Sequence, residues 1–241
     1  MLVISAQEAK ADTLSSQSTI WWNRRSVTIP TVEAPVRADP GPRSAQRAAV
    51  RRRLVRGGRT VLAGSGFAGA SVRDVAAAAG LNRATFYAHF DSKAELARAV
   101  CAEVVASAGP EWQRLDDVLV DGSQERLREW LASTVPWWER NADVLPALRE
   151  TAAVDPDTGR MLGALFTALT DHLHRCTDGF DEARRRRVLL TTQLLVVQLD
   201  QVVFDHVVLG IGDVDLPELL DLLAEIWHAA APTPRVVMPP R

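Results

Sequence analysis

The chain has little cysteine and no long hydrophobic run. Cys101 and Cys176 are the only 2 cysteines among 241 residues, and their wide spacing excludes both a disulfide framework and a CxxC metal or redox motif. No uninterrupted apolar segment reaches the ~18 residues of a membrane span. No basic stretch followed by an apolar core marks a signal peptide at the N-terminus. We therefore expect no membrane association and a reducing, cytoplasmic compartment.

Proline is concentrated near the two ends of the chain and is rare between them, except at expected helix starts. The interior is rich in Ala, Leu, Arg and Glu and has few alternating β-branched residues, a composition typical of an all-α protein. Residues 1–43 lack periodicity and are predicted to be a disordered extension, and residues 232–241 a flexible tail. Trp21 and Trp22 are unusual in such an extension. They indicate either a start codon assigned too far upstream or a tail that packs on the protein.

Lysine is almost absent, since Lys10 and Lys93 are the only lysines, and the charge is unevenly distributed. Residues 43–105 contain 11 Arg or Lys against 4 Asp or Glu, whereas residues 106–241 contain 13 against 22. Residues 1–42 contain 4 of each, so the formal net charge of -2 conceals a basic segment and an acidic one. A basic segment of this kind is suited to contact with nucleic-acid phosphates.

Residues 44–64 are predicted to form a helix, because Val50, Leu54, Val61 and Leu62 recur at helical spacing. Gly57 and Gly58 lie in its middle, where each glycine costs about 1 kcal/mol relative to alanine. Either a neighbouring helix crosses closely at this point or the glycines reflect sequence drift.

The segment Ser71–Lys93 has the pattern of two short helices joined by a tight turn. Ser71 and Asn82 are the expected N-caps of the two helices, and Gly80 is expected to adopt a positive φ in the turn. The inner side is apolar, formed by Val75, Ala76, Leu81, Phe86 and Phe90. A small residue, a turn glycine and apolar residues in this order are typical of a helix-turn-helix, and the surrounding positive charge indicates that it binds double-stranded DNA.

The remaining sequence is predicted to be a larger helical domain. Ser92 and Glu95 form a capping box for a helix that runs to about Ala108. Further helices are expected at 123–141, 141–153, 155–176, 181–209 and 216–230. The last two are apolar on most faces, so each needs partners on more than one side. They form either the core of a monomer or a homodimer interface, and we favour the homodimer because a helix-turn-helix usually binds two half-sites.

The segment from Leu54 to Leu96 resembles the DNA-binding domain of the TetR family of transcriptional regulators. The matching residues are Leu54-Val55, Val61-Leu62, Gly66-Phe67, Ser71, Asp74-Val75-Ala76, Ala79-Gly80-Leu81, Asn82, Thr85-Phe86-Tyr87, His89-Phe90, Ser92-Lys93 and Leu96. Gly57-Gly58, Asn82 and Ala84 depart from the residues that are common in the family. The resemblance implies an N-terminal helix-turn-helix domain, here residues 44–92, and a helical effector-binding and dimerisation domain, here residues 93–231.

The resemblance also implies that the second helix of the motif enters the major groove. The expected DNA-contacting residues are Ser71, Arg73, Arg83, Ala84, Thr85, Tyr87, His89 and Lys93. Arg83 either donates to a guanine edge or contacts a phosphate, and the methyl of Ala84 or Thr85 is placed to touch thymine. The other members are expected to contact phosphates, although Ser71 is also explained as a cap alone. Residues 37–47 are either an unstructured tail or an arm that reaches the DNA.

The acidic domain is expected to hold a small, hydrophobic effector in a cavity lined by Trp130, Trp137, Trp138, Phe166, Leu169 and Phe204. The implied function is a repressor that binds a palindromic operator and is released by this effector. No catalytic group, cofactor or metal is expected. His172 and Cys176 share a helix face, but no third ligand stands at a recognisable spacing. A metal-responsive regulator and an architectural DNA-binding protein are the alternatives.

Overall fold

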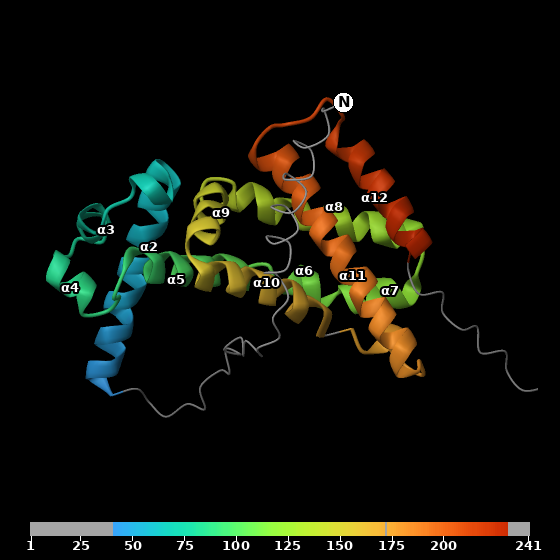
Figure 1. Ribbon diagram of the computed structural model, residues 1–241, viewed down its shortest axis with the longest axis horizontal. Coiled ribbons are helices and arrows are strands. Elements are labelled where there is room, and N and C mark those ends of the chain that lie inside the picture. The colour runs from blue at the N-terminus through green and yellow to red at the C-terminus, as the bar shows by residue number, and fades with distance from the viewer. Residues whose placement is uncertain (1–40, 172, 231–241) are drawn as a thin grey trace, which may run out of the picture. The chain divides into compact units, whose positions relative to one another are not determined.

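The computed structural model describes residues 41–171 and 173–230, and within these ranges the chain is helical with no strand. The predicted all-α fold is confirmed (Figure 1). The elements are α2 (Pro42–Gly69), α3 (Val72–Ala78), α4 (Arg83–Tyr87), α5 (Lys93–Ala106), α6 (Gly109–Gln113), α7 (Leu115–Asp121), α8 (Gln124–Asn141), α9 (Leu145–Val154), α10 (Pro156–Asp171), the 3-10 turn η1 (Arg175–Thr177), α11 (Glu182–Val203), the π-turn η2 (Phe204–Val208) and α12 (Leu216–Ala230). The expected extension and tail, with Trp21 and Trp22, lie outside the described residues, apart from residues 41–43.

Helix α2 packs against α3 and α5 and forms the N-terminal domain with α3 and α4 (Figure 1). It begins at Pro42 and is interrupted at Gly66, whose φ of 68° and ψ of 178° are not helical. A positive φ is costly for any residue with a Cβ, so glycine is required at this break. The apolar core of this domain is buried, with Leu54 and Phe86 at 0% exposure, and Leu96 of α5 packs into it at 0% exposure.

The two mid-helix glycines of α2 lie where neighbouring helices approach most closely. A Cβ at Gly57 would be 2.9 Å from the backbone nitrogen of Ala79 and 3.0 Å from the carbonyl oxygen of Val75, both contributed by the α3 segment. A Cβ at Gly58 would be 2.7 Å from a methyl carbon of Leu96 on α5. Close crossing, rather than sequence drift, therefore accounts for both glycines.

The prediction of one helix from 155 to 176 was wrong at its C-terminal end. Helix α10 ends at Asp171, and Cys176 lies in the separate turn η1. The carboxylate of Asp116 on α7 accepts the backbone N–H groups of His174, Arg175 and Cys176 at 3.1, 2.8 and 2.9 Å. A buried acceptor that takes three N–H groups of this segment holds it as a turn against α7 instead of a continued helix.

Residues 109–122 form two short helices that were not predicted. Gly109 and Pro110 open α6, where proline is tolerated because a first-turn N–H has no partner inside the helix. Helix α7 ends at Gly122, which has a φ of 68°. Gly109 and Pro110 therefore separate α5 from α6 and also begin the second of these helices.

The larger domain is organised around α8, which packs against α7 and α12. Trp130 on α8 has 0% exposure and contacts Trp112 and Trp227, with ring centroids 5.2 and 5.3 Å apart. Its indole N–H donates to the Glu111 carbonyl at 2.9 Å. The three indoles join α6, α8 and α12 into one core.

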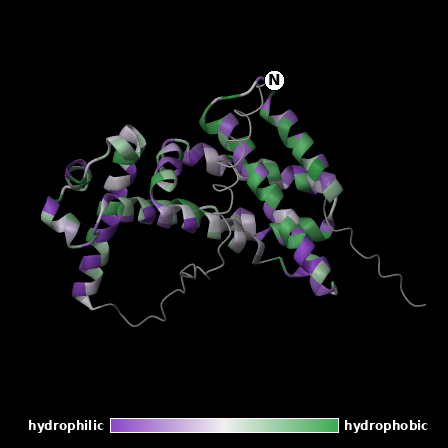
Figure 2. Cartoon of the chain, in the orientation of Figure 1, coloured by the Kyte–Doolittle hydropathy of each residue, from purple (hydrophilic) through white to green (hydrophobic). Residues whose placement is uncertain are grey.

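Helices α11 and α12 carry apolar residues on exposed as well as buried faces (Figure 2). The exposed apolar side chains are Leu190, Leu194 and Val197 on α11 and Leu222 and Ile226 on α12, and Leu194 is 72% exposed. By length and composition, Glu182–Val208 is the one stretch of the described chain that would suffice to cross a membrane. It carries four successive arginines, Arg184–Arg187, close to its start and packs on α10 and α12, as the core helix of a folded domain does.

Candidate nucleic-acid interface and cavity

The turn of the helix-turn-helix is fixed by a Schellman motif. The N–H of Leu81 donates to the Ala76 carbonyl at 2.8 Å and the N–H of Gly80 to the Ala77 carbonyl at 2.9 Å. Gly80 has a φ of 64°, which a residue with a Cβ adopts only with strain. Arg53 on α2 adds a bond from its guanidinium to the Ala79 carbonyl at 2.9 Å, so the turn is also tied to α2.

Both helices of the motif are capped by the residues that the sequence indicates. Ser71 Oγ accepts the N–H of Asp74 at 3.2 Å, and Asn82 Oδ1 accepts the N–H of Thr85 at 2.8 Å. The Thr85 hydroxyl also donates to Asn82 Oδ1 at 3.0 Å, so this side chain is held against the cap. These bonds fix where α4 starts and therefore which side chains project from its first turn.

Arg83, Ala84 and Tyr87 form the exposed face of α4, and Tyr87 is 46% exposed. The Arg83 guanidinium lies 5.6 Å from the Tyr87 ring centroid and donates to its hydroxyl at 3.4 Å. This contact between residues one helical turn apart pre-orders the arginine on the surface. Phe86 and Phe90 lie inside, with 0% and 1% exposure, so the two faces of the helix are cleanly separated.

His89 follows α4 and lies close to arginines of α2. Burial, followed by the positive charges of Arg47 and Arg51, lowers the pKa of His89, so its imidazole is neutral at pH 7 and offers one N–H donor. The Arg51 guanidinium lies 4.6 Å from the Phe90 ring centroid. Arg47 and Arg51 are exposed. Arg47 ends the segment 37–47 that the sequence offers as an arm, whereas Arg51 is not among the predicted DNA-contacting residues. Its spacing of four residues from Arg47 on one basic helix is the signal that could have found it.

The other predicted DNA-contacting residues occupy different positions. Arg73 is exposed on α3, and Ser71 is half-buried at its cap. The Lys93 ammonium donates to the carbonyls of Phe67 and Ala70 at 2.5 and 2.8 Å, a contact that closes the end of α2. A structural role for Lys93 is therefore visible, and its phosphate contact stays a prediction.

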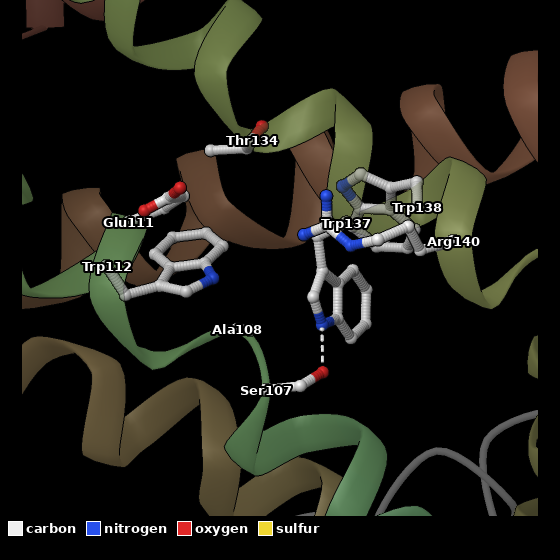
Figure 3. Close-up of a pocket in the computed structure, with 8 residues that line it drawn as sticks. All are labelled: Ser107, Ala108, Glu111, Trp112, Thr134, Trp137, Trp138 and Arg140. Atoms are coloured by element: carbon white, nitrogen blue, oxygen red, sulfur yellow. Dashed lines mark hydrogen bonds between the residues drawn. The ribbon is translucent and has the colours of Figure 1, made fainter.

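The larger domain contains a cavity of about 320 Å³ between α5, α6, α8, α9, α10 and α11. Its walls include Cys101, Val104, Val105, Trp112, Gln113, Trp137, Trp138, Leu145, Leu148, Arg149, Leu162, Val196 and Asp200. A smaller space of about 100 Å³ adjoins it and shares Ala108, Trp112, Trp137 and Trp138 (Figure 3). The Trp137 indole N–H donates to Ser107 Oγ at 2.9 Å and to the Val104 carbonyl at 3.2 Å.

The six residues predicted to line an effector cavity are distributed unevenly over the domain. Trp137 and Trp138 lie on the wall, and Trp130 lies in the core outside it. Phe204 is 4% exposed and supports the Arg149 guanidinium, whose carbon is 3.4 Å from the ring centroid. The side chains of Phe166 and Leu169 lie outside the described part of α10.

Arg149 and Asp200 provide the charge on the cavity wall, and sequence reasoning missed both. Arg149 Nη2 is 2.7 Å from Asp200 Oδ2, and Arg149 Nη1 donates to Gln201 Oε1 at 3.2 Å. Burial raises the pKa of Asp200 to about 6, the negative charge of Asp205 adds to this rise, and Arg149 opposes it. The Asp200 carboxylate is therefore mostly ionised at pH 7, but its ion pair with Arg149 does not fully offset the cost of burying its charge.

Nothing in the described residues resembles a metal centre, since no group of three or more His, Cys, Asp or Glu side chains is placed to hold an ion there. His172 lies outside the described residues. Burial raises the pKa of the Cys101 and Cys176 thiols to about 12, so both stay protonated and unreactive at neutral pH.

Two sets of contacts join the cavity to the DNA-binding domain. Helix α5 begins at Lys93, which holds the end of α2, and its Cys101, Val104 and Val105 reach the cavity. Helix α9 contributes Leu145, Leu148 and Arg149 to the cavity, and its Glu150 carboxylate accepts the N–H groups of Phe67 and Ala68 at 2.7 and 2.9 Å. Arg59 of α2 pairs with Asp143 at 3.0 Å.

The fold and the motif together define a helix-turn-helix transcriptional regulator with a second helical domain. Residues 54–100 match the model of the family described as bacterial regulatory proteins, tetR family. The helix-turn-helix segment of this chain therefore matches the DNA-binding domain of tetR-family transcriptional regulators.

Solved structures share this fold at low sequence identity. A putative TetR-family regulator from Mesorhizobium loti MAFF303099 is 16% identical, with a TM-score of 0.53 over 77% of this chain and 96% of its own. A transcriptional regulator from Rhodococcus sp. RHA1 is 23% identical, with a TM-score of 0.54 over 75% and 95%. The fatty acid degradation regulator FadR from Bacillus halodurans is 19% identical, with a TM-score of 0.50 over 73% and 93%. A search of the curated proteins found no match to the chain.

Proposed function

We propose that this regulator is a cytoplasmic repressor that binds a palindromic operator as a homodimer and leaves it when a small, largely hydrophobic effector enters the cavity. It has no catalytic role in this proposal. The observation that carries it is that one helix, α5, starts at the bonds that close the DNA-binding domain and ends on the wall of a 320 Å³ cavity.

The basic domain supports the DNA-binding half of the proposal. The exposed face of α4 presents Arg83, Ala84 and Tyr87, and Arg47 and Arg51 extend the positive surface onto α2. In the major groove, Arg83 would donate to a guanine edge, while the more peripheral arginines would neutralise phosphates. The sequence-specific and the non-specific contributions to DNA affinity would therefore come from different residues.

The exposed apolar face of α11 and α12 supports the homodimer. Leu190, Leu194 and Val197 recur at helical spacing on α11, and Leu222 and Ile226 are one turn apart on α12. Helices α11 and α12 contact one another, so the two rows can form a joint surface. Two copies of such a surface would pair as a four-helix arrangement and would set the distance between the two α4 helices.

The cavity supports effector release by population shift. A ligand that fits only one arrangement of α5 and α9 would favour that arrangement, and both helices hold the end of α2. Its effect on DNA affinity can be no larger than its difference in affinity for the two arrangements.

The DNA-binding half is tested by selecting bound duplexes from a random pool and measuring affinity by fluorescence anisotropy at several salt concentrations. We expect an inverted repeat to be selected, and Arg83→Ala to weaken binding to it by about tenfold or more, as the loss of one bidentate base contact predicts. Arg185→Ala, at the exposed start of α11, is the control and should leave the affinity unchanged. A steep salt dependence without sequence preference would favour an architectural protein instead.

The effector half is tested by a thermal-shift ligand screen followed by anisotropy on the selected operator. Binders that raise the melting temperature should weaken operator binding. Binders without any effect on operator affinity would contradict the proposal. Operator binding that requires added zinc would support the metal-responsive alternative.

A further inference from the structure

The cavity has one polar end in otherwise apolar surroundings. Among the described residues that line it, Arg149 and Asp200 are the charged ones and Gln113 is an uncharged polar one. The guanidinium of Arg149 is already engaged, because it rests on Phe204, donates to Gln201 and pairs with Asp200. Asp200 uses Oδ2 in this pair, and no described donor meets its Oδ1. The available group at the polar end is therefore an acceptor with a negative charge.

The balance of charge at this end is negative. Arg149 contributes one positive charge, while Asp200 and Asp205 contribute two negative ones, and the charge of Asp205 acts on Asp200. The amide of Gln201 donates to Asp205 at 2.8 Å but does not neutralise it. An incoming cation would bring the local sum to zero, whereas an incoming carboxylate would leave two negative charges uncompensated in a poorly solvated site.

The aromatic walls suit the same kind of ligand. Trp112 and Trp137 stand on opposite sides of the smaller space that adjoins the cavity, and Trp138 meets Trp137 edge to face, with centroids 4.8 Å apart (Figure 3). Indole faces attract an alkylated or delocalised cation, whose weak hydration makes its transfer into an apolar cavity less costly. Residues 106–241 also carry 22 acidic against 13 basic residues, so the field of the domain favours the entry of cations.

We propose that the effector is an organic cation, a lipophilic amine or quaternary ammonium compound, whose positive nitrogen lies beside the Asp200 carboxylate and whose apolar body lies against the indoles of Trp112, Trp137 and Trp138. The inference rests on the proposed function, in which this cavity is the effector site. The inference adds to that function the charge of the effector and names Asp200 as the residue that selects this charge.

The test compares three probes on the full chain by isothermal titration calorimetry at pH 7.5. They are benzyltrimethylammonium, its neutral carbon isostere neopentylbenzene, and the anion 4-phenylbutyrate. We expect the cation to bind at least about tenfold more tightly than either of the others, because only the cation is attracted both by the partly buried carboxylate and by the indole faces. Asp200→Asn should abolish this preference, and Asp200→Glu should retain part of it.

Two controls keep the test decisive. Asp213→Asn changes an exposed carboxylate outside the cavity and should leave the preference intact. If Asp200→Asn does not fold, the wild-type chain at pH 5 gives the same information, because protonation of Asp200 should remove the preference there. The charged groups that act on Asp200 are Arg149 from α9 and Asp205 from η2. Cys101 from α5 lines the same cavity, and burial raises the pKa of its thiol to about 12.

Equal or tighter binding of neopentylbenzene or 4-phenylbutyrate, no binding of the cation at millimolar concentration, or an unchanged preference in Asp200→Asn would each overturn the inference. The proposed function fails by a different readout, the loss of any ligand effect on operator affinity. If a neutral or anionic probe released the protein from the operator, the inference of a cationic effector would be refuted, whereas the proposed repressor function would be supported.

Discussion

Replacing Gly57 by alanine should loosen the helix-turn-helix, although alanine is the better helix former. At an exposed position inside a helix, the change from glycine to alanine stabilises by about 0.5–1 kcal/mol. At Gly57 the new Cβ would lie 2.9 Å from the Ala79 nitrogen and 3.0 Å from the Val75 oxygen. Both are backbone atoms, which cannot rotate away, so α3 must move relative to α2. Overpacking of this kind costs about 1–3 kcal/mol, and a clash with two backbone atoms belongs to the upper part of that range, so a net loss of about 1–2 kcal/mol remains.

The matched control lies in the same helix. Gly64 is exposed, and a Cβ there would meet nothing within 4 Å. Gly64→Ala should therefore raise the melting temperature by about 1–4 °C, whereas Gly57→Ala should lower it by about 2–8 °C, given the usual shift of about 2–4 °C per kcal/mol for a chain of this size. Gly58→Ala should fall between them, because its clash is with the Leu96 side chain, which has some freedom to rotate.

Thermal denaturation followed by circular dichroism measures all three variants, and operator affinity provides a second readout. Because α3 and α4 are joined by the short turn at Gly80, a displaced α3 should also weaken DNA binding by Gly57→Ala but not by Gly64→Ala. If Gly57→Ala stabilised the protein as much as Gly64→Ala, the close crossing would not be the reason for the glycine.

Three further predictions concern single contacts. Asp116→Asn should destabilise the chain by about 1–3 kcal/mol in urea denaturation, because an amide supplies one acceptor oxygen for three N–H groups. Burial acts to raise the pKa of Asp116, but the N–H donors outweigh burial and lower the pKa. The stabilisation by this carboxylate should therefore be present at neutral pH and lost as the pH falls through the lowered pKa. Equal stability of Asp116→Asn and the wild-type chain at pH 7 would contradict the prediction. Leu194→Glu should convert a dimer to monomers in sedimentation analysis, whereas Leu209→Glu, exposed but outside the α11 row, should not. Glu150→Gln should accelerate hydrogen exchange at the amides of Phe67 and Ala68 without changing exchange in α8, and unchanged rates would show that these bonds contribute little.

The helix-turn-helix could be predicted from sequence because its determinants are local. Each cap is a bond between residues three positions apart, as for Ser71 with Asp74 and Asn82 with Thr85. Gly80 is required by a turn that spans only six residues. Such contacts are encoded in short patterns, so the residues and their spacing were sufficient.

The cavity could not be predicted in the same way because its determinants are distant in sequence. Arg149 and Asp200 meet across 51 residues, and neither belongs to a recognisable motif. The structural role of Lys93 was missed for the same reason, because its ammonium donates to carbonyls 23 and 26 residues away, while its predicted phosphate contact stays a prediction. Aromatic composition alone found Trp137 and Trp138 on the wall but could not separate them from Trp130 in the core.

Helix α9 contacts both the cavity and the end of α2. Its successive residues Arg149 and Glu150 point in directions about 100° apart, because a helix has about 3.6 residues per turn. Arg149 meets the cavity, and Glu150 accepts two N–H groups just beyond the break in α2 at Gly66. A ligand that shifts the backbone of α9 would therefore either stretch the two hydrogen bonds to the Glu150 carboxylate or move the end of α2 with it. Since bonds to a charged acceptor are costly to break, movement of α2 is the favoured response. Gly66, which can occupy backbone conformations closed to other residues, is placed where that movement would be absorbed.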